Sequence, residues 1–228
     1  MKMKTILISG IVSGVTLLAQ GQTQSTTFTS TAVPVAVSAT NGVAGQQSTV
    51  TVAGLMDVAI QDVTVSVDIT GGWNGSLYLA LVDPKGNLTV LLNRIGYGTA
   101  SVYGGLGDWG GGLNVTFSDS AAVNIHDAAN GGLLTGVYQP DGREVSPLAS
   151  GSELYNTLPT ADLSALAGQD PANAEGVWTL FMASVVSDAP DAQLVAWSLT
   201  ITTIPEPGTV AMVALGLAGL GIARRSRR

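Results

Sequence analysis

Cysteine is absent from this chain of 228 residues, and histidine occurs once. Disulfide bonds and thiolate chemistry are therefore excluded, and any catalysis that needs a histidine would depend on His126 alone. Aromatic residues make up 5% of the chain and charged residues 11%, so the sequence has little of either. Stability must come from a hydrophobic core, which a chain of this length is long enough to build.

Basic residues are scarce between the two ends of the chain. Six of the nine positive charges lie in the first four and the last five residues. Residues 22–204 keep Lys85, Arg94 and Arg143 against fifteen acidic residues, a net charge of about −12. Such a surface repels phosphate, so we expect no nucleic-acid partner, whereas divalent cations or basic partners would be attracted.

The amino-terminal segment has the three parts of a secretory signal peptide. Lys2 and Lys4 form a basic start, residues 6–18 form an apolar stretch, and residues 19–21 read Ala-Gln-Gly. Small residues in this pattern predict cleavage after Gly21, following delivery by Sec-type export machinery. An uncleaved anchor is the alternative, although thirteen apolar residues are short for a membrane span.

The carboxyl-terminal segment is uncharged from Gly208 to Ala223 and ends in an arginine cluster, Arg224, Arg225, Arg227 and Arg228. A helix there has no polar face, so we expect it in a membrane. Arginines beside a span are retained on the cytoplasmic side. The residues before Pro205 are then expected outside the cytoplasm.

Pro205-Glu206-Pro207 precedes this apolar segment, and its prolines favour the extended backbone that proteases bind. The motif, the apolar helix and the arginine cluster together resemble the PEP-CTERM sorting signal of exported bacterial proteins. The resemblance implies transient anchoring in the inner membrane, processing by an exosortase-like membrane protease, and delivery to the cell envelope or an extracellular biofilm matrix. An ordinary single-span anchor is the alternative.

Short alternating segments and 29 glycines predict an all-β domain with two packed sheets. Val63 to Ile69 and Val195 to Ile201 place an apolar residue at every second position, as a strand with one buried face does. Other expected strands are 49–53, 77–82, 88–92, 113–118 and 177–183. A short helix is expected at 161–167, and long loops at 96–112 and 127–160.

Residues 30–203 also resemble the P domain (P/Homo B) that follows the catalytic domain of subtilisin-like proprotein convertases. The first signature is residues 69–86, and five landmarks follow in order: 117–121, 136–140, 163–168, 176–180 and 194–201. The resemblance implies a jelly-roll-like β-sandwich, here without a preceding protease. Gly71-Gly72 and Ser76 replace polar residues that the family usually has, so a role that needs those residues is not expected.

The expected organisation is a signal peptide at 1–21, a linker at 22–29, the sandwich at 30–203 and the sorting signal at 204–228. No Gly-x-Ser-x-Gly motif accompanies His126, and no pair of acids stands out for glycoside hydrolysis. We therefore expect a non-catalytic binding or structural module. The alternatives are a carbohydrate-binding matrix protein, a secreted hydrolase and a protease-associated accessory domain.

The glycine-rich segment 96–112 is the candidate ligand loop. It holds Asp108 and Trp109, with Tyr97 and Tyr103 nearby. An indole stacks on a sugar ring while a carboxylate accepts from its hydroxyls, so the loop is a candidate site for an exopolysaccharide. The alternative is a loop that folds back onto its own sandwich. The other tryptophans are expected in the core: Trp73, Trp178 and Trp197.

Four loop aspartates are candidate ligands of a structural calcium ion, because this cation prefers oxygen donors. They are Asp119 and Asp127, which flank Asn124, and Asp188 with Asp191. Neither the EF-hand nor the RTX pattern is present, and aspartates that form turns are the alternative. No other cofactor is expected.

Overall fold

The structure is a computed structural model that describes residues 23–31, 33–37, 45–55, 58–99, 105–159, 162–166 and 169–205. The chain divides into two units, residues 22–206 and a second unit made of 1–21 and 207–228. The expected signal cleavage at Gly21, the apolar helix, Glu206, Pro207 and the arginine cluster lie outside the described residues. No helix in the described part is long and apolar enough to cross a membrane.

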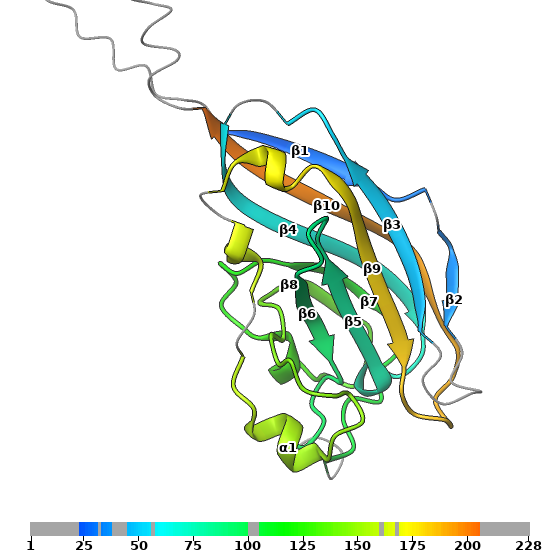
Figure 1. The fold of residues 1–228 in the computed structure, drawn as a ribbon. Coiled ribbons are helices and arrows are strands. Elements are labelled where there is room, and N and C mark those ends of the chain that lie inside the picture. The colour runs from blue at the N-terminus through cyan, green and yellow to red at the C-terminus, as the bar shows by residue number, and fades with distance from the viewer. Residues whose placement is uncertain are drawn as a thin grey trace, which may run out of the picture. The chain divides into compact units, whose positions relative to one another are not determined.

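The described residues of the larger unit form an all-β sandwich of two sheets (Figure 1). The first sheet has the order β1 (Gln24–Thr29), β10 (Ala192–Pro205), β4 (Val58–Gly71), β7 (Leu113–Phe117) and β8 (Leu134–Tyr138), with β2 (Val35–Val37) also paired to β10. The second sheet has the order β3 (Gln46–Val52), β9 (Gly176–Ser184), β5 (Leu77–Val82) and β6 (Leu88–Asn93). These pairs are antiparallel except β7 with β8, which is parallel.

Helical segments in the described part are short. They are η1 (Asn74–Ser76), η3 (Ile125–Asp127), α1 (Gly151–Asn156), η4 (Leu163–Leu166) and η5 (Pro171–Asn173). The expected helix at 161–167 is thus a single 3-10 segment, and the expected loop at 127–160 contains β8 and α1. Residues 24–29, taken from sequence as part of a linker, form strand β1 along one side of β10.

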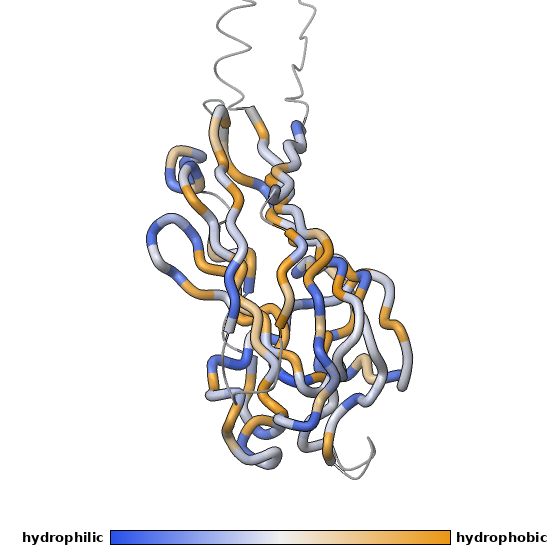
Figure 2. The backbone as a smooth tube through the Cα atoms, turned by 90° about the vertical axis from the view of Figure 1, so that its right-hand side faces the viewer, coloured by the Kyte–Doolittle hydropathy of each residue, from blue (hydrophilic) through white to orange (hydrophobic). Residues whose placement is uncertain are grey.

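The core lies between the two sheets, where alternation along each strand turns every second side chain inward. Val63, Val65, Val67 and Ile69 of β4 are at most 2% exposed, as their spacing predicted. Figure 2 shows hydrophobic and hydrophilic residues alternating along the strands. The expected burial of two tryptophans is confirmed, since Trp178 and Trp197 are each 1% exposed.

A β-bulge in β10 changes one expected core position. The pairing of β10 with β4 shifts between Leu194 and Ala196, so the alternation slips by one residue there. Leu194 is consequently buried at 1% exposure, and Val195, which alternation from Trp197 placed in the core, is 36% exposed. The prediction was wrong at this one position because a constant period of two cannot represent a bulge.

The two ends of the sandwich differ in what they carry. At one end Pro205 of β10 pairs with Val58 of β4, and at the other end Ala192 pairs with Gly71. The intervening 14-residue strand β4 separates the ends by about 40 Å at ~3.3 Å per residue. We call the end near Gly71 the distal end. It is formed by the segments that follow β4, β6 and β9.

Candidate functional site

A small hollow opens at the distal end of the sandwich. Its volume is about 130 Å³, and the side chains around it include Trp73, Ser76, Arg94, Leu106, Trp109 and Val186. Pockets for whole small molecules usually measure ~300–1,000 Å³, so this hollow fits one ring or one small group of a larger ligand. The lining combines two indoles, two aliphatic side chains and one cation.

The two indoles of Trp73 and Trp109 stack on each other beside this hollow. Their ring centroids are 5.7 Å apart and their planes differ by 17°. Trp109 is 49% exposed and its neighbour Leu106 is 58% exposed, so an apolar surface reaches solvent at the mouth. Trp73 was expected in the core, but it is only partly buried and lies at the hollow instead.

Asp108 fixes the loop that carries Trp109. Its side chain is fully buried, and Oδ1 accepts hydrogen bonds from the backbone N–H of Gly110 at 2.9 Å and of Gly131 at 3.0 Å. Oδ2 accepts longer ones from Asn130 N–H and the Asn74 side-chain amide. The carboxylate thus joins the loop to the segment after η3. Its acceptor positions serve the protein's own backbone rather than a sugar.

Glycine at position 75 lets two backbones approach closely under the hollow. A Cβ built there would lie 2.5 Å from the backbone nitrogen of Asp108 and 2.8 Å from the carbonyl carbon of Gly107. The Gly75 N–H also donates to the Asp108 carbonyl oxygen at 2.7 Å. No side chain fits into this contact, so the sequence Trp-Asn-Gly after β4 determines where the Trp109 loop can sit.

Arg94 is the cation of the hollow. Its side chain is 8% exposed, its Nε donates to the Gly75 carbonyl oxygen at 3.1 Å, and its Nη1 donates to the Pro147 carbonyl oxygen at 3.4 Å. The guanidinium carbon lies 3.3 Å from the centroid of the Tyr97 ring, a cation–π contact. Burial lowers the pKa of Arg94 from its ordinary value, with Tyr97 acting in the opposite direction.

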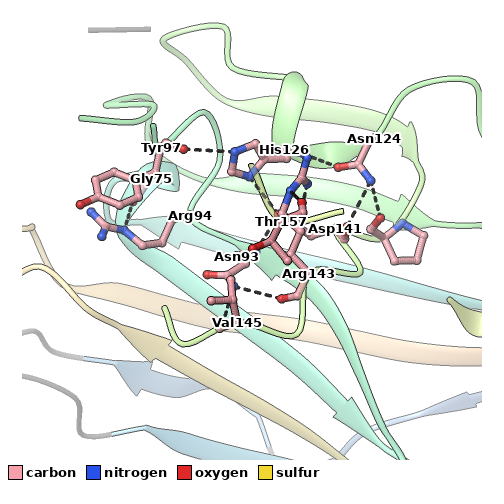
Figure 3. A network of polar contacts seen from close by, with 11 residues as sticks. Gly75, Asn93, Arg94, Tyr97, Asn124, His126, Asp141, Arg143, Val145 and Thr157 are labelled. Carbon is pink, nitrogen blue, oxygen red and sulfur yellow. Dashed lines mark hydrogen bonds and ion pairs between the residues drawn. The ribbon is translucent and has the colours of Figure 1, made fainter. Parts of the chain in front are cut away.

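A buried polar network contacts the backbone of Tyr97 and of Asn93, the residue before Arg94 (Figure 3). His126 is fully buried, with Nδ1 3.0 Å from Asp141 Oδ2 and Nε2 3.2 Å from the Tyr97 carbonyl oxygen. Arg143 donates to the other oxygen of Asp141 at 2.9 Å. The backbone N–H of Asn93 donates to Asp141 Oδ2 at 3.2 Å. Both ring nitrogens of His126 therefore face acceptors inside the protein and are closed to a substrate.

Sequence reasoning identified His126 but missed Asp141 and Arg143. One signal was present: Arg143 is one of only three basic residues in 22–204, and a buried cation is usually paired with a carboxylate. Nothing in the sequence showed that Asp141 would be that carboxylate, because Asp141 and His126 come together only through the η3 turn and the end of β6.

Of the four residues of the candidate ligand loop, three lie at or beside the hollow: Asp108, Trp109 and, through Arg94, Tyr97. Tyr103 lies outside the described residues. The structure therefore brings the described members together, with Asp108 facing inward.

The candidate calcium ligands are not gathered at one place. Asp119 Oδ1 accepts the backbone N–H of Leu163 at 3.1 Å, and burial raises the pKa of Asp119. Asp127, Asp188 and Asp191 are exposed. Across the described ranges, no three Asp, Glu or His side chains lie together as a metal site requires. Calcium binding stays a prediction that the donor set does not support.

Comparison with known proteins identifies the tail of the chain. The family model of the PEP-CTERM protein-sorting motif matches residues 203–228. Similar solved structures include the serine protease of Aeromonas sobria, at 14% identity and a TM-score of 0.34, and the same protease in complex with its chaperone ORF2, at 13% and 0.35. These matches cover 81% and 82% of this chain, which spans 27% of the protease's length in each.

No curated protein matches the chain. The motif match confirms the expected sorting signal. The chain carries the sorting motif of exported proteins that are anchored transiently in the membrane and processed by an exosortase.

Proposed function

We propose that the sandwich is a non-catalytic binding module of an exported envelope or extracellular-matrix protein, and that it binds glycan at the distal hollow. One observation carries this proposal: the stacked Trp73 and Trp109 pair, which ends in an exposed indole beside a ring-sized hollow. The C–H face of a sugar ring packs well on such a surface, because it is apolar while its rim of hydroxyls stays in water. We propose an exopolysaccharide as the ligand, because this is the glycan of the envelope and extracellular matrix.

The position of the hollow supports the proposal. It lies at the distal end, about 40 Å along β4 from Pro205, which belongs to the sorting motif at residues 203–228. A ligand at the hollow is therefore distant from Pro205, the one residue of the Pro-Glu-Pro motif that the structure describes. The loops around the hollow are also held rigidly by buried hydrogen bonds. Asp108 accepts one from the Gly110 N–H, and His126 is bonded to Asp141.

The absence of catalysis is part of this proposal and rests on two placements. The ring of His126 is buried with both nitrogens occupied, and the carboxylate of Asp108 is occupied by backbone N–H groups. Neither is available to attack a substrate or to transfer a proton to one. A hydrolase is the alternative, and turnover of oligosaccharides by the purified exported protein, lost on removal of one carboxylate, would establish it.

Binding is tested on a glycan array with the exported protein purified from its cells. We expect binding that Trp109→Ala weakens by about 10-fold or more, because the exposed stacking face is removed. Tyr155→Ala is the matched control, since Tyr155 is a 47% exposed aromatic on α1 that does not line the hollow. Absence of glycan binding by the unaltered protein, or equal loss in both variants, would contradict the proposal.

A protease-associated accessory role is the second candidate. It is supported by the P-domain-like landmarks, whose segments include the β4–β5 connection, the end of β7, β9 and β10. This second candidate includes the proposal that the strands of the sandwich are connected as in a jelly roll. Co-purification of a subtilisin-like protease with the exported protein would support it, and recovery of the protein alone under mild salt would count against it.

A further inference from the structure

We infer that the distal hollow recognises a sugar that carries a carboxylate, with Arg94 as the group that binds it. This inference rests on the proposed function, and it names the ligand class of that same site. Three observations carry it: the lack of a carboxylate partner for Arg94 among the described residues, its backbone conformation, and the apolar walls around it.

The first observation is an unmatched buried cation. Arg143 and Arg94 are both at least 92% buried, since they are 7% and 8% exposed. Arg143 is paired with Asp141 at 2.9 Å, whereas no carboxylate in the described part of the chain lies within 4.0 Å of a nitrogen of Arg94. Burying a charge without an opposite charge beside it is unfavourable. The Gly75 and Pro147 carbonyls and the Tyr97 side chain hold the guanidinium without supplying a full negative charge, so a ligand carboxylate would supply one.

The second observation is backbone strain at the same residue. Arg94 has φ 58°, and among the described residues it is the only non-glycine with a positive φ, while thirteen glycines adopt one. Glycine takes this conformation without a steric penalty, and arginine does not. Strain of this kind persists where the surrounding structure holds the residue in place, and it is concentrated at active and binding sites. Here Arg94 stands in the turn after β6, and its side chain lines the hollow.

The third observation is the surroundings of the cation. Trp73, Trp109 and Val186 line the hollow beside Arg94. Apolar walls exclude water and strengthen an ion pair formed between them. A guanidinium binds a carboxylate through paired charge-assisted hydrogen bonds. A uronic acid fits both parts, because its ring can stack on Trp109 while its carboxylate enters the hollow.

The charge of the whole module restricts the ligand further. With about −12 on residues 22–204, the surface repels a polyanion at long range. Isolated uronic acids in an otherwise neutral glycan avoid most of this repulsion. Interactions between exposed charges are largely screened beyond ~8 Å at 0.15 M salt but only beyond ~30 Å at 0.01 M, and a buried pair is screened much less. The affinity for the acidic glycan should therefore not fall with added salt.

The experiment compares two oligosaccharides by titration calorimetry on the exported protein: one with a single glucuronic acid, and the same one carboxyl-reduced to glucose. We expect about 10- to 100-fold tighter binding of the acidic form, the range of hydrogen bonds to a charged group. Arg94→Gly, which suits the φ of 58°, should remove this preference, so that the two forms bind with equal affinity. Lys85→Ala, which removes an exposed positive charge from the β5–β6 turn, should keep the preference.

The outcomes separate the two proposals. Equal affinity of the unaltered protein for both oligosaccharides overturns the carboxylate inference alone, and so does an unchanged preference in Arg94→Gly. A fall in affinity for the acidic form between about 0.01 and 0.15 M salt also contradicts it. Binding of neither form overturns the proposed function as well. Because the unaltered protein already decides the preference, the inference stays testable even if Arg94→Gly does not fold.

Discussion

The substitution Asp141→Asn tests whether the buried network is a structural support of the distal end. It keeps the size and shape of the side chain but removes the charge that faces Arg143 at 2.9 Å and His126 at 3.0 Å. Asp141 is 0% exposed and Arg143 is 7% exposed, so solvent cannot replace the lost partner.

The magnitude follows from what is left behind. Removing one partner of a buried ion pair leaves the other charge uncompensated and costs about 3–5 kcal/mol. This is a large share of the ~5–15 kcal/mol that stabilises a typical domain. In a domain of ~150–250 residues each kcal/mol lowers the melting temperature by about 2–4 °C. The expected decrease is therefore roughly 6–20 °C.

Thermal unfolding of the exported protein, followed by tryptophan fluorescence, measures this decrease. Asp127→Asn is the matched control, because Asp127 is an exposed carboxylate in the same 3-10 segment as His126. Exposed substitutions of this kind change stability by about 0.5 kcal/mol or less. If Asp141→Asn melts within 2–3 °C of the control, roughly the effect of 1 kcal/mol, the network is not the support described here.

Three further outcomes are expected. Burial raises the pKa of Asp119, so the ionised carboxylate destabilises the folded state. Asp119→Asn should therefore resist urea better than the unaltered protein near neutral pH, and this gain should vanish below the ordinary pKa of aspartate. Lower stability of the variant near neutral pH would refute this. Gly75→Ala should lose about 1–3 kcal/mol and glycan binding, whereas Gly132→Ala, whose nearest neighbour is 3.9 Å away, should lose neither. Since β10 is paired with β4 as far as Pro205, the intact mass of the exported form should include this residue, and a shorter product would contradict the fold.

The strands of the sandwich were largely predictable because each is a local pattern. The period-two spacing of Val63 to Ile69 and the turn after β5 follow from neighbouring residues alone, and both match the structure. Val195 shows the limit of this reasoning. A bulge depends on pairing with a distant strand, and no local period contains it.

The sequence predicted which residues lie at the site but not what each of their side chains binds. Glycines around Asp108 and Trp109 indicated a special loop, and the loop does reach a hollow. The same pattern suggested that Asp108 contacts a ligand, whereas its oxygens bind the N–H groups of Gly110 and Gly131. The hydrogen-bond partners of a carboxylate depend on segments far away in the sequence. For Asp108 one such partner is Gly131, which lies in the segment after η3.

The sequence by itself determined the all-β class, the acidic surface and the sorting motif at residues 203–228, because alternation, charge count and a terminal motif are properties of neighbouring or summed residues. Only the tertiary structure decided that Trp73 joins Trp109, that Arg143 has a carboxylate while Arg94 has none among the described residues, and that His126 is closed to solvent. Trp73 and Trp109 are distant in the sequence, and the burial of Arg94, Arg143 and His126 depends on packing by other segments; both exist only once the two sheets have closed over the core.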